Sequence, residues 1–447
     1  MKRVASVRQL ALDCLIRLEE DNAPIARLIN CTILQSRLDA LDCGLLNELV
    51  YGVVRWRKKL DWILRQFVDS RFQLDLKSRN ILRLGAYQLL HLDRVPPHAA
   101  IYETVELAKP KRKHAQFINA VLRSVQRNAN RLEFSSLQAD PLQHISISLS
   151  YPQWLVKRWL IHYDSEWTLA FCRASNQIAP LSIRLNSLKT NREELIESLR
   201  ADSVTVKESQ ISPDGLILAD SPSLQSLQAY RNGWFYVQDE SAMLVAHLLN
   251  PQPEKKVVDL CAAPGGKTSH IAQLMGNTGQ IVAVDVSQDR VRRIEENCQR
   301  LGITNILPQV ANSVNDSLEF VKYADFVLID APCSGFGTLR RHPDIRWNKS
   351  PEQINELAQL QLNLLQNAVR HVKPGGVLVY STCSTEPEEN EMVVRRFLKK
   401  RPNIVIESAG EFLPAMPPHA ITSEGFLQTF PHEHGTDGAF AVRLRVS

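Results

Sequence analysis

Two cysteines and one aspartate have the types and positions from which a reactive site could be built. The segment DAPCSG (330–335) contains Asp330 and Cys333 and directly follows an apolar run, and the segment STCS (381–384), which contains Cys383, follows a second one. If both runs are parallel strands, their carboxyl ends lie on the same rim of a sheet. The spacing therefore predicts that both thiols and the carboxyl group of Asp330 meet at that rim.

These three groups match the requirements for methylating carbon 5 of a pyrimidine. That carbon is too weak a nucleophile to attack a methylsulfonium directly, whereas addition of a thiolate at carbon 6 makes it enamine-like. A carboxyl group can bind the base, and a further group must assist removal of the carbon 5 proton so that the thiol can leave. Cys383, Cys333 and Asp330 suit these roles as a set. The residues alone do not decide which cysteine attacks, and either one alone is also consistent with a buried structural thiol.

A glycine-containing segment, DLCAAPGGKT (259–268), connects a predicted strand to a predicted helix. Gly265 and Gly266 permit backbone amides to approach a ligand at a helix N-terminus, and Asp285, after the next strand, is placed to accept hydrogen bonds from ribose hydroxyls. The segment fails the P-loop pattern because position 261 is cysteine, and no GxGxxG dinucleotide motif is present. These features predict a nucleoside pocket at the same rim; the alternative is a glycine turn that binds no ligand.

Alternating strands and helices must position these residues. Strands are predicted at 257–261, 281–286, 306–310, 326–329 and 377–380. Between the last two, Ser350 is a natural N-cap that starts a helix, with Pro351 first and Gln353 completing a capping box, and the run 374–376 (PGG) is expected to end it. This alternation predicts a doubly wound α/β domain with a mostly parallel sheet over residues 236–447.

The rest of the chain divides into two further modules. Residues 141–235 contain short alternating segments at 181–185, 204–207 and 216–218, with a turn at Asp214-Gly215, and predict a small α/β module that includes a hairpin. Residues 1–140 have apolar residues at helical spacing and predict an all-α domain, with breaks at Pro96-Pro97 and at Pro110.

Positive charge is concentrated in the helical domain. Residues 1–140 hold 23 Lys and Arg against 15 Asp and Glu, a net of +8, whereas the remaining residues hold 30 against 33, a net of −3. Two basic clusters lie there, RWRKK (55–59) and the set Lys109, Lys111, Arg112 and Lys113. Either cluster could be a solvated helical face, but their place in one net-basic domain favours contact with RNA.

Cysteine usage and hydropathy argue against several classes of protein. The eight cysteines show no CxxC or Cys/His ligand spacing, so neither a disulfide framework nor a metal site is expected. No apolar run of about 18 residues is present, and charged residues interrupt any N-terminal signal peptide. We therefore expect a cytoplasmic protein with no membrane span.

The chemistry-bearing segments resemble those of the cytosine-5 RNA methyltransferases of the NOL/NOP/sun family. The likeness rests on DLCAAPGGKTSHIA (259–272), DAPCSGFGTLRRHPDIRW (330–347), YSTCS (380–384) and TDGAFAVRL (436–444). NELVYGVVRW (47–56) and FINAVLR (117–123) resemble a NusB-like RNA-binding domain. The resemblance covers nearly the whole chain and is greatest to the bacterial branch that carries such a domain and methylates 16S ribosomal RNA.

The resemblance implies a Rossmann-like class I methyltransferase domain with a seven-stranded sheet. It also implies S-adenosylmethionine as cofactor, 16S ribosomal RNA or a small-subunit precursor as partner, and a monomeric protein. Cys383 would be the nucleophile, and Cys333 would assist release. The cofactor site would be lined by Cys261, Ala262, Ala263, Pro264, Gly265, Gly266, Lys267, Asp285, Asn312 and Asp330. Asn312 stands where the family usually has an aspartate.

Other functions compete with this one. The chain could be an RNA-binding ribosome assembly factor with little catalytic activity, or it could methylate another RNA such as tRNA. The intact Asp330, Cys333 and Cys383 speak against the assembly factor. A methyltransferase for DNA, protein or a small molecule is a further alternative, against which the basic helical domain and the TCS cysteine argue.

Overall fold

The computed structural model describes residues 6–21, 23–69, 73–109, 111–220, 223–314, 316, 323–413, 416–417 and 419–447. The chain forms two compact units. The helical unit runs to Gln177 and includes Arg341–Lys349, and the second unit comprises Ile178–Arg340 and Ser350–Ser447. The module expected over 141–235 is thus divided, because its first part groups with the helices and its strands group with the second unit.

The helical unit confirms the predicted all-α start of the chain. It contains α1 (Val7–Asp21), α2 (Ile25–Gln35), α3 (Ala40–Arg65), α4 (Leu76–His91), α5 (Pro97–Glu106), α6 (Arg112–Asn128), α7 (Pro141–Ser148), α8 (Gln153–His162), α9 (Ser165–Ala174) and α15 (Ile345–Asn348). The break expected at Pro96-Pro97 separates α4 from α5, whereas Pro110 lies outside the described residues.

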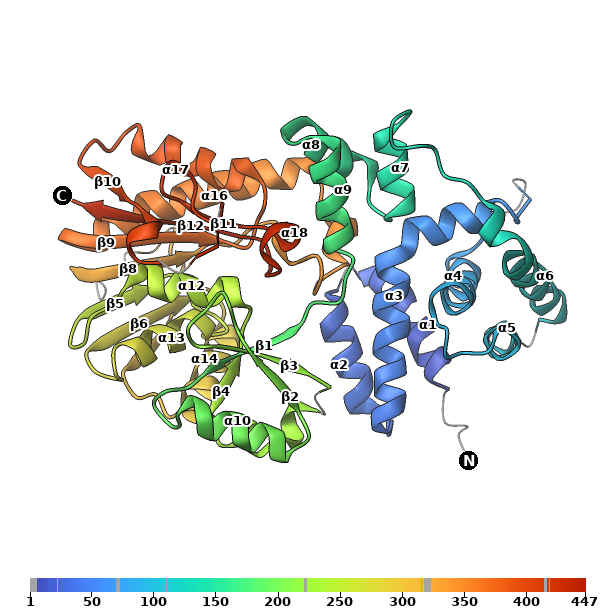
Figure 1. The fold of residues 1–447 in the computed structure, drawn as a ribbon, viewed down its shortest axis with the longest axis horizontal. Helices are drawn as coiled ribbons and strands as arrows, with labels where there is room; N and C mark the ends of the chain where they lie inside the picture. Colours follow the sequence, from blue (N-terminus) through green and yellow to red (C-terminus); the bar gives the residue numbers. More distant parts are fainter. Residues whose placement is uncertain are drawn as a thin grey trace. The chain divides into compact units, whose positions relative to one another are not determined.

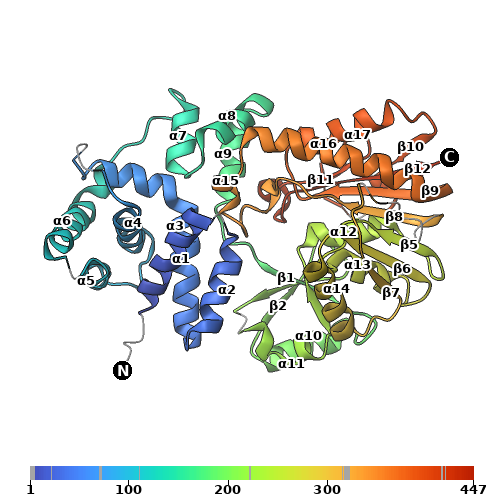
Figure 2. The ribbon, with the colours of Figure 1, turned by 180° about the vertical axis from the view of Figure 1, so that it is seen from behind.

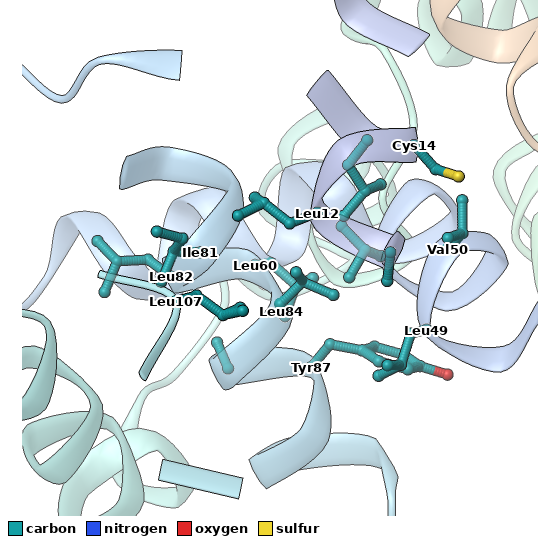
Figure 3. Packing of buried hydrophobic residues seen from close by; sticks show 14 of the residues in the cluster. Leu12, Cys14, Leu49, Val50, Leu60, Ile81, Leu82, Leu84, Tyr87 and Leu107 are labelled. Carbon is teal, nitrogen blue, oxygen red and sulfur yellow. The ribbon is translucent and has the colours of Figure 1, made fainter. Parts of the chain in front are cut away.

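Helices α1, α3 and α4 lie side by side around the core of this unit (Figure 1). Figure 3 shows leucines from all three helices meeting there, with Cys14 and Tyr87 among them. Gly52 on α3 allows the ring of Tyr87 on α4 to come close, since a Cβ at Gly52 would lie 2.0 Å from that ring. Close packing of this kind fixes the face of α3 that remains outside the core.

A small antiparallel sheet opens the second unit. Its order is β2-β3-β1-β4, and the elements are β1 (Leu181–Leu185), α10 (Arg192–Ala201), β2 (Thr205–Glu208), β3 (Gly215–Ala219), α11 (Gln228–Arg231) and β4 (Phe235–Val237). β2 and β3 form the predicted hairpin.

The large sheet has the order β10-β12-β9-β8-β5-β6-β7, and a short eighth strand, β11, pairs with β12. The seven strands of this path match the expected number, and β5 to β9 run parallel while β12 is antiparallel to its neighbours. The strands are β5 (Lys256–Asp259), β6 (Gln280–Asp285), β7 (Ile306–Val310), β8 (Ala324–Asp330), β9 (Val372–Thr382), β10 (Ile404–Glu407), β11 (Leu427–Thr429) and β12 (Ala439–Val446).

Helices cover both faces of the large sheet, as a doubly wound fold requires. On one face lie α12 (Glu240–Leu249), α13 (Gly266–Leu274) and α14 (Gln288–Leu301), and on the other lie α16 (Pro351–Ala368) and α17 (Glu391–Leu398) (Figures 1 and 2). Successive strand residues feed the two cores: Val257 packs with the first set of helices and Val258 with the second. A last short helix, α18 (Pro431–His434), precedes β12.

The predicted start of α16 is confirmed, but its predicted end is wrong. The capping box between Ser350 and Gln353 is formed. The helix ends at Ala368 rather than at 374–376, which lies inside β9. Val372 pairs with Ala324 of β8, but the next pair is Val377 with Phe326. The residues between Val372 and Val377 therefore form a bulge in β9, in which Gly375 has a positive φ of 73°. In the part of the chain that the structure describes, no helix is long and apolar enough to cross a membrane.

Candidate active site

The two thiols predicted to cooperate lie next to each other. Asp330 at the end of β8 is paired in parallel register with Ser381 on β9, so the DAPC and STCS segments leave the sheet at the same level. As a result the sulfur atoms of Cys333 and Cys383 are 3.2 Å apart, and both side chains are half-buried. Strand register alone therefore brings together two residues that are far apart in the sequence.

Either sulfur of this pair could donate the hydrogen that lies between them. The hydrogen bond to Cys383, together with burial and nearby negative charge, raises the pKa of Cys333 well above its usual value. The direction of this shift favours Cys333 as the protonated member of the pair.

Asp330 is oriented by two neighbours. Its Oδ2 accepts a hydrogen bond from Nζ of Lys267 at 2.6 Å, and its Oδ1 accepts one from the hydroxyl of Ser381 at 3.0 Å. Burial lowers the pKa of Lys267, but the charges of Asp330 and, to a smaller extent, Cys383 outweigh it and raise that pKa overall. The ammonium group thus lies where it stabilises negative charge on Asp330 and on Cys383. The family resemblance implies only a cofactor-binding role for Lys267.

A buried carboxylate, Glu389, ties the two cysteine loops together. Its Oε1 accepts the backbone N–H of Ser334 (2.8 Å) and the amide of Gln361 (3.0 Å), and its Oε2 accepts the hydroxyls of Ser334 (2.5 Å) and Ser384 (2.5 Å). Ser334 follows Cys333 and Ser384 follows Cys383, so a single side chain fixes the residue after each thiol. No spacing rule in the sequence pointed to Glu389.

The neighbouring residue, Asn390, holds the second loop a further time. Its Nδ2 donates to the carbonyl oxygen of Ser384 at 3.0 Å, and its Oδ1 accepts the hydroxyl of Thr382 at 2.6 Å. One amide side chain is therefore hydrogen-bonded to the residues on both sides of Cys383, through the hydroxyl of Thr382 and the backbone of Ser384. Such supporting bonds limit the movement of the thiol relative to Cys333.

A cavity of about 480 Å³ opens beside these groups, a size typical of small-molecule sites. Among the residues predicted for the cofactor, those that line it are Cys261, Ala263, Asp285, Asn312 and Asp330, and both thiols line it as well. Ala262, Pro264 and Gly265 in the adjoining loop, and Gly266 and Lys267 at the start of α13, are not lining residues. The sequence did not identify several further lining residues, which include Leu260, Val286, Arg290, Ser313, Val314, Leu360 and Leu364.

The polar groups in the cavity fit a nucleoside. Asp285 is buried, and its Oδ2 accepts the backbone N–H of Ala263 at 3.2 Å. Its Oδ1 has no hydrogen-bond partner among the described residues, although Nη1 of the half-exposed Arg290 lies 3.5 Å from it. Asn312 uses its Oδ1 to accept the N–H of Val314 at 3.0 Å, which leaves its amide hydrogens for a ligand. A buried carboxylate oxygen gains from a hydrogen-bond donor, and ribose hydroxyls are such donors.

In the segment 259–268, Gly266 makes room for a neighbouring ring, and Gly265 permits a left-handed backbone conformation before α13. A Cβ at Gly266 would lie 3.0 Å from the ring of Tyr236 on β4, and Gly265 has a φ of 96° at the start of α13. Buried Arg184 on β1 donates to the carbonyl oxygen of Gly266 (2.7 Å) and the hydroxyl of Ser269 (2.9 Å). The small sheet therefore braces the loop, a role that its sequence did not reveal.

A further polar cluster joins the residue before β3 of the small sheet to helices α12 and α13. Asp214 Oδ2 accepts hydrogen bonds from Nε2 of His247 (2.7 Å) and of His270 (2.8 Å). These three residues could also offer ligand atoms to a metal ion. The N···O distances are those of hydrogen bonds, and burial lowers the pKa of His270 to about 3, so a neutral histidine donates to the carboxylate.

Comparison with protein families gives matches to three parts of the chain. Residues 246–445 match the model described as 16S rRNA methyltransferase RsmB/F, residues 5–127 match the NusB family, and residues 151–225 match the ferredoxin-like domain of RsmF/B-like methyltransferases. The chain is 36% identical to a probable ribosomal RNA small subunit methyltransferase B of Bacillus subtilis, over 98% of each chain. It is 34% identical to ribosomal RNA small subunit methyltransferase B of an Enterobacter species, over 98% of each.

Solved structures agree with this assignment. The crystal structure of PH0851 is similar with a TM-score of 0.81 and 30% identity, over 99% of each chain. NSun6 from Pyrococcus horikoshii, solved with SFG, has a TM-score of 0.59 and 25% identity, over 66% of this chain and 98% of that one. On this evidence of sequence and fold, the chain belongs to the RsmB/F family of rRNA methyltransferases, which use S-adenosylmethionine as cofactor.

Proposed function

We propose that this protein methylates carbon 5 of a cytosine in 16S ribosomal RNA through a covalent bond between Cys383 and carbon 6 of the base. The observation that carries the proposal is the pair of sulfur atoms 3.2 Å apart on the wall of a cavity that also holds Asp330. Methylation of an oxygen or an exocyclic nitrogen needs no thiol, whereas addition and elimination at a pyrimidine use one thiol to attack and a second group to release.

The charges around the pair suit Cys383 as the attacking group. The raised pKa of Cys333 favours its protonated form, which can donate its hydrogen towards Cys383, 3.2 Å away. The ammonium group of Lys267 lies close enough to stabilise the Cys383 thiolate. Attack by this thiolate on carbon 6 gives carbon 5 enamine character, and Asp330 is placed to bind the polar edge of the base.

The cofactor would be held by groups that the cavity presents. Asp285 would accept hydrogen bonds from the ribose, Asn312 would donate to the adenine side, and Val286 offers an apolar side chain that is 60% exposed. Bound there, S-adenosylmethionine supplies an electrophilic methyl group to carbon 5.

Release requires Cys333 to change its role. Once Cys383 is bonded to carbon 6 it no longer carries the charge that raises the pKa of Cys333, so Cys333 can lose its proton to solvent more readily. Its thiolate then takes the proton from carbon 5, the electrons of that bond restore the ring double bond, and the carbon–sulfur bond breaks to return Cys383 as a thiolate.

The helical unit is proposed to dock the RNA, and its two basic clusters differ. In the 55–59 cluster, Arg55 is buried and Arg57 is paired with Glu19 at 3.0 Å. The other set, which we call the α5–α6 basic cluster, is exposed throughout (Lys109, Lys111, Arg112 and Lys113). Lys109 pairs with Glu106, and the exposed side chains of Lys111, Arg112 and Lys113 can approach phosphates.

The direct test is methyl transfer from labelled S-adenosylmethionine to 16S ribosomal RNA, followed by digestion to nucleosides. The expected product is labelled 5-methylcytidine, and mapping would place it at one position. Label in another nucleoside, or no transfer to RNA, would contradict the proposed function.

A further inference from the structure

A groove of about 470 Å³ lies in the helical unit, on a face of α3 that does not enter the core. Lys58, Trp62 and Arg65 succeed each other along α3 at intervals of about one helical turn and line one side. Gln143 on α7 and Trp347 on α15 line the other sides of the groove. We call this the α3–α7 groove. It is separate from the α5–α6 basic cluster in sequence.

The groove carries positive charge that the residues described by the structure do not neutralise. The one carboxylate among its lining residues, Asp61, forms an ion pair with Arg83, with N···O distances of 2.6 and 2.7 Å. Arg57 forms an ion pair with Glu19. Among the described residues, no carboxylate lies within ion-pair distance of Lys58 or Arg65, and burial together with the charge of Arg65 lowers the pKa of Lys58 to about 8. A cation in such a position gains most from an anionic ligand.

Two tryptophans and two amides complete the lining. The ring of Trp62 packs against Phe134 with centroids 4.8 Å apart and remains only half-buried. Gln143 accepts a hydrogen bond from the exposed Gln153 at 2.9 Å, so the opposite rim presents amide donors and acceptors. Cations for phosphates, aromatic rings for stacking and amides for base edges are the groups that single-stranded nucleic acids require together.

The wall formed by Trp347 is rigid. Its indole N–H donates to the carbonyl oxygen of Val54 at 2.8 Å. The preceding residue, Arg346, is fully buried, donates to Asn176 at 2.8 Å and lies 4.0 Å over the ring of Tyr151. Trp347 also belongs to the segment 341–349, which directly continues the chain from the loop that contains Cys333.

We infer that the α3–α7 groove binds a single-stranded segment of the substrate RNA, with Lys58 and Arg65 on phosphates and Trp62 stacked on a base. The inference rests on the proposed function, and it names a contact surface different from the α5–α6 basic cluster. RNA bound in this groove would contact Trp347, which belongs to the segment 341–349. This segment follows the loop that contains Cys333 in the sequence.

The test uses the full-length protein and a labelled single-stranded RNA of about 12 nucleotides, within the site size of known single-strand grooves. The double variant Lys58→Gln/Arg65→Gln is compared with Arg17→Gln/Arg27→Gln, which removes the same charge from exposed positions of the same unit. We expect the Kd of the first to rise about tenfold and its log Kd–log salt slope to fall by about 1.4, that is about 0.7 for each of two phosphate contacts. The control variant should keep the parental values.

A second variant separates stacking from charge. Trp62→Leu keeps an apolar group against Phe134 but removes the ring face, so binding should weaken about tenfold with an unchanged salt slope. A duplex of the same length and a short oligoglutamate serve as comparison ligands. Parental affinity for the single-stranded RNA in both variants overturns the inference. An equal loss of affinity for the duplex also overturns it. A loss of affinity confined to oligoglutamate would overturn it in favour of an acidic protein partner. Methyl transfer by the parent protein, measured in parallel, reports on the proposed function independently of the groove.

Discussion

Glu389 offers a test of how the two thiols are held. Replacing it with alanine removes the acceptor for four hydrogen bonds, from Ser334 (backbone and hydroxyl), Ser384 and Gln361. The two hydroxyls lie 3.0 Å apart and can bond to each other, and Gln361 also donates to the carbonyl oxygen of Pro332. The N–H of Ser334 is then the donor left without a partner.

The cost of Glu389→Ala follows from these contacts. The buried N–H of Ser334 left without an acceptor costs about 1–3 kcal/mol of stability. Because both cysteine loops lose their shared anchor, a shift of about 1 Å between the sulfurs should lower the rate of methyl transfer about 100-fold. Glu389→Gln keeps one acceptor oxygen, so it should lose much less stability and much less of the methyl-transfer rate.

The assay is single-turnover methyl transfer at saturating cofactor and RNA, with the melting temperature measured for each variant. Glu356→Ala, on the exposed side of α16, is the matched control and should behave as the parent. Cofactor affinity should remain near parental in Glu389→Ala, since Asp285 and Asn312 are not bonded to Glu389. A folded Glu389→Ala variant that transfers methyl groups at the parental rate would show that this carboxylate does not position the thiols.

Three further outcomes are expected. Asp285→Ala should weaken S-adenosylmethionine binding by about 1–3 kcal/mol in calorimetric titration, and unchanged affinity would mean that its Oδ1 does not meet the ribose. Neutralising the α5–α6 basic cluster should weaken RNA binding and flatten its salt dependence while the melting temperature hardly moves; an unchanged slope in filter binding would remove the cluster from the RNA surface. Burial lowers the pKa of His270 to about 3, while an unfolded histidine titrates near about 6.5, so the unfolded chain binds the proton that the folded chain excludes. Stability should therefore be full above about pH 6.5 and fall by about 2 kcal/mol towards pH 5, and His270→Gln should flatten this part of the curve in urea denaturation; an unflattened curve would assign the dependence to other groups.

The sequence predicted the fold class and the meeting of the thiols because both depend on local pattern. Alternating strand and helix signals define a parallel sheet, and residues after parallel strands share a rim, which brings Cys333 to Cys383. The capping box at Ser350 was predictable for the same reason, since it involves residues only three positions apart.

Features that depend on distant contacts were not predictable. The hydrogen bonds of Glu389 and the bracing of Gly266 by Arg184 join residues with no common spacing rule. The PGG run was read as a helix stop because those residues disfavour helix, yet the same property makes a bulge in β9, and local propensity cannot tell the two apart. The roles of the cofactor-loop residues that do not line the cavity remain a prediction.

The covalent step is tested most directly by trapping protein on RNA. Cys333→Ala, incubated with S-adenosylmethionine and 16S ribosomal RNA, should accumulate a complex that survives a denaturing gel, because release lacks its base while attack by Cys383 proceeds. Cys383→Ala and the double variant should give no complex and no methyl transfer. A denaturation-resistant complex formed by Cys383→Ala, or free turnover by that variant, would contradict the assignment of Cys383 as the nucleophile.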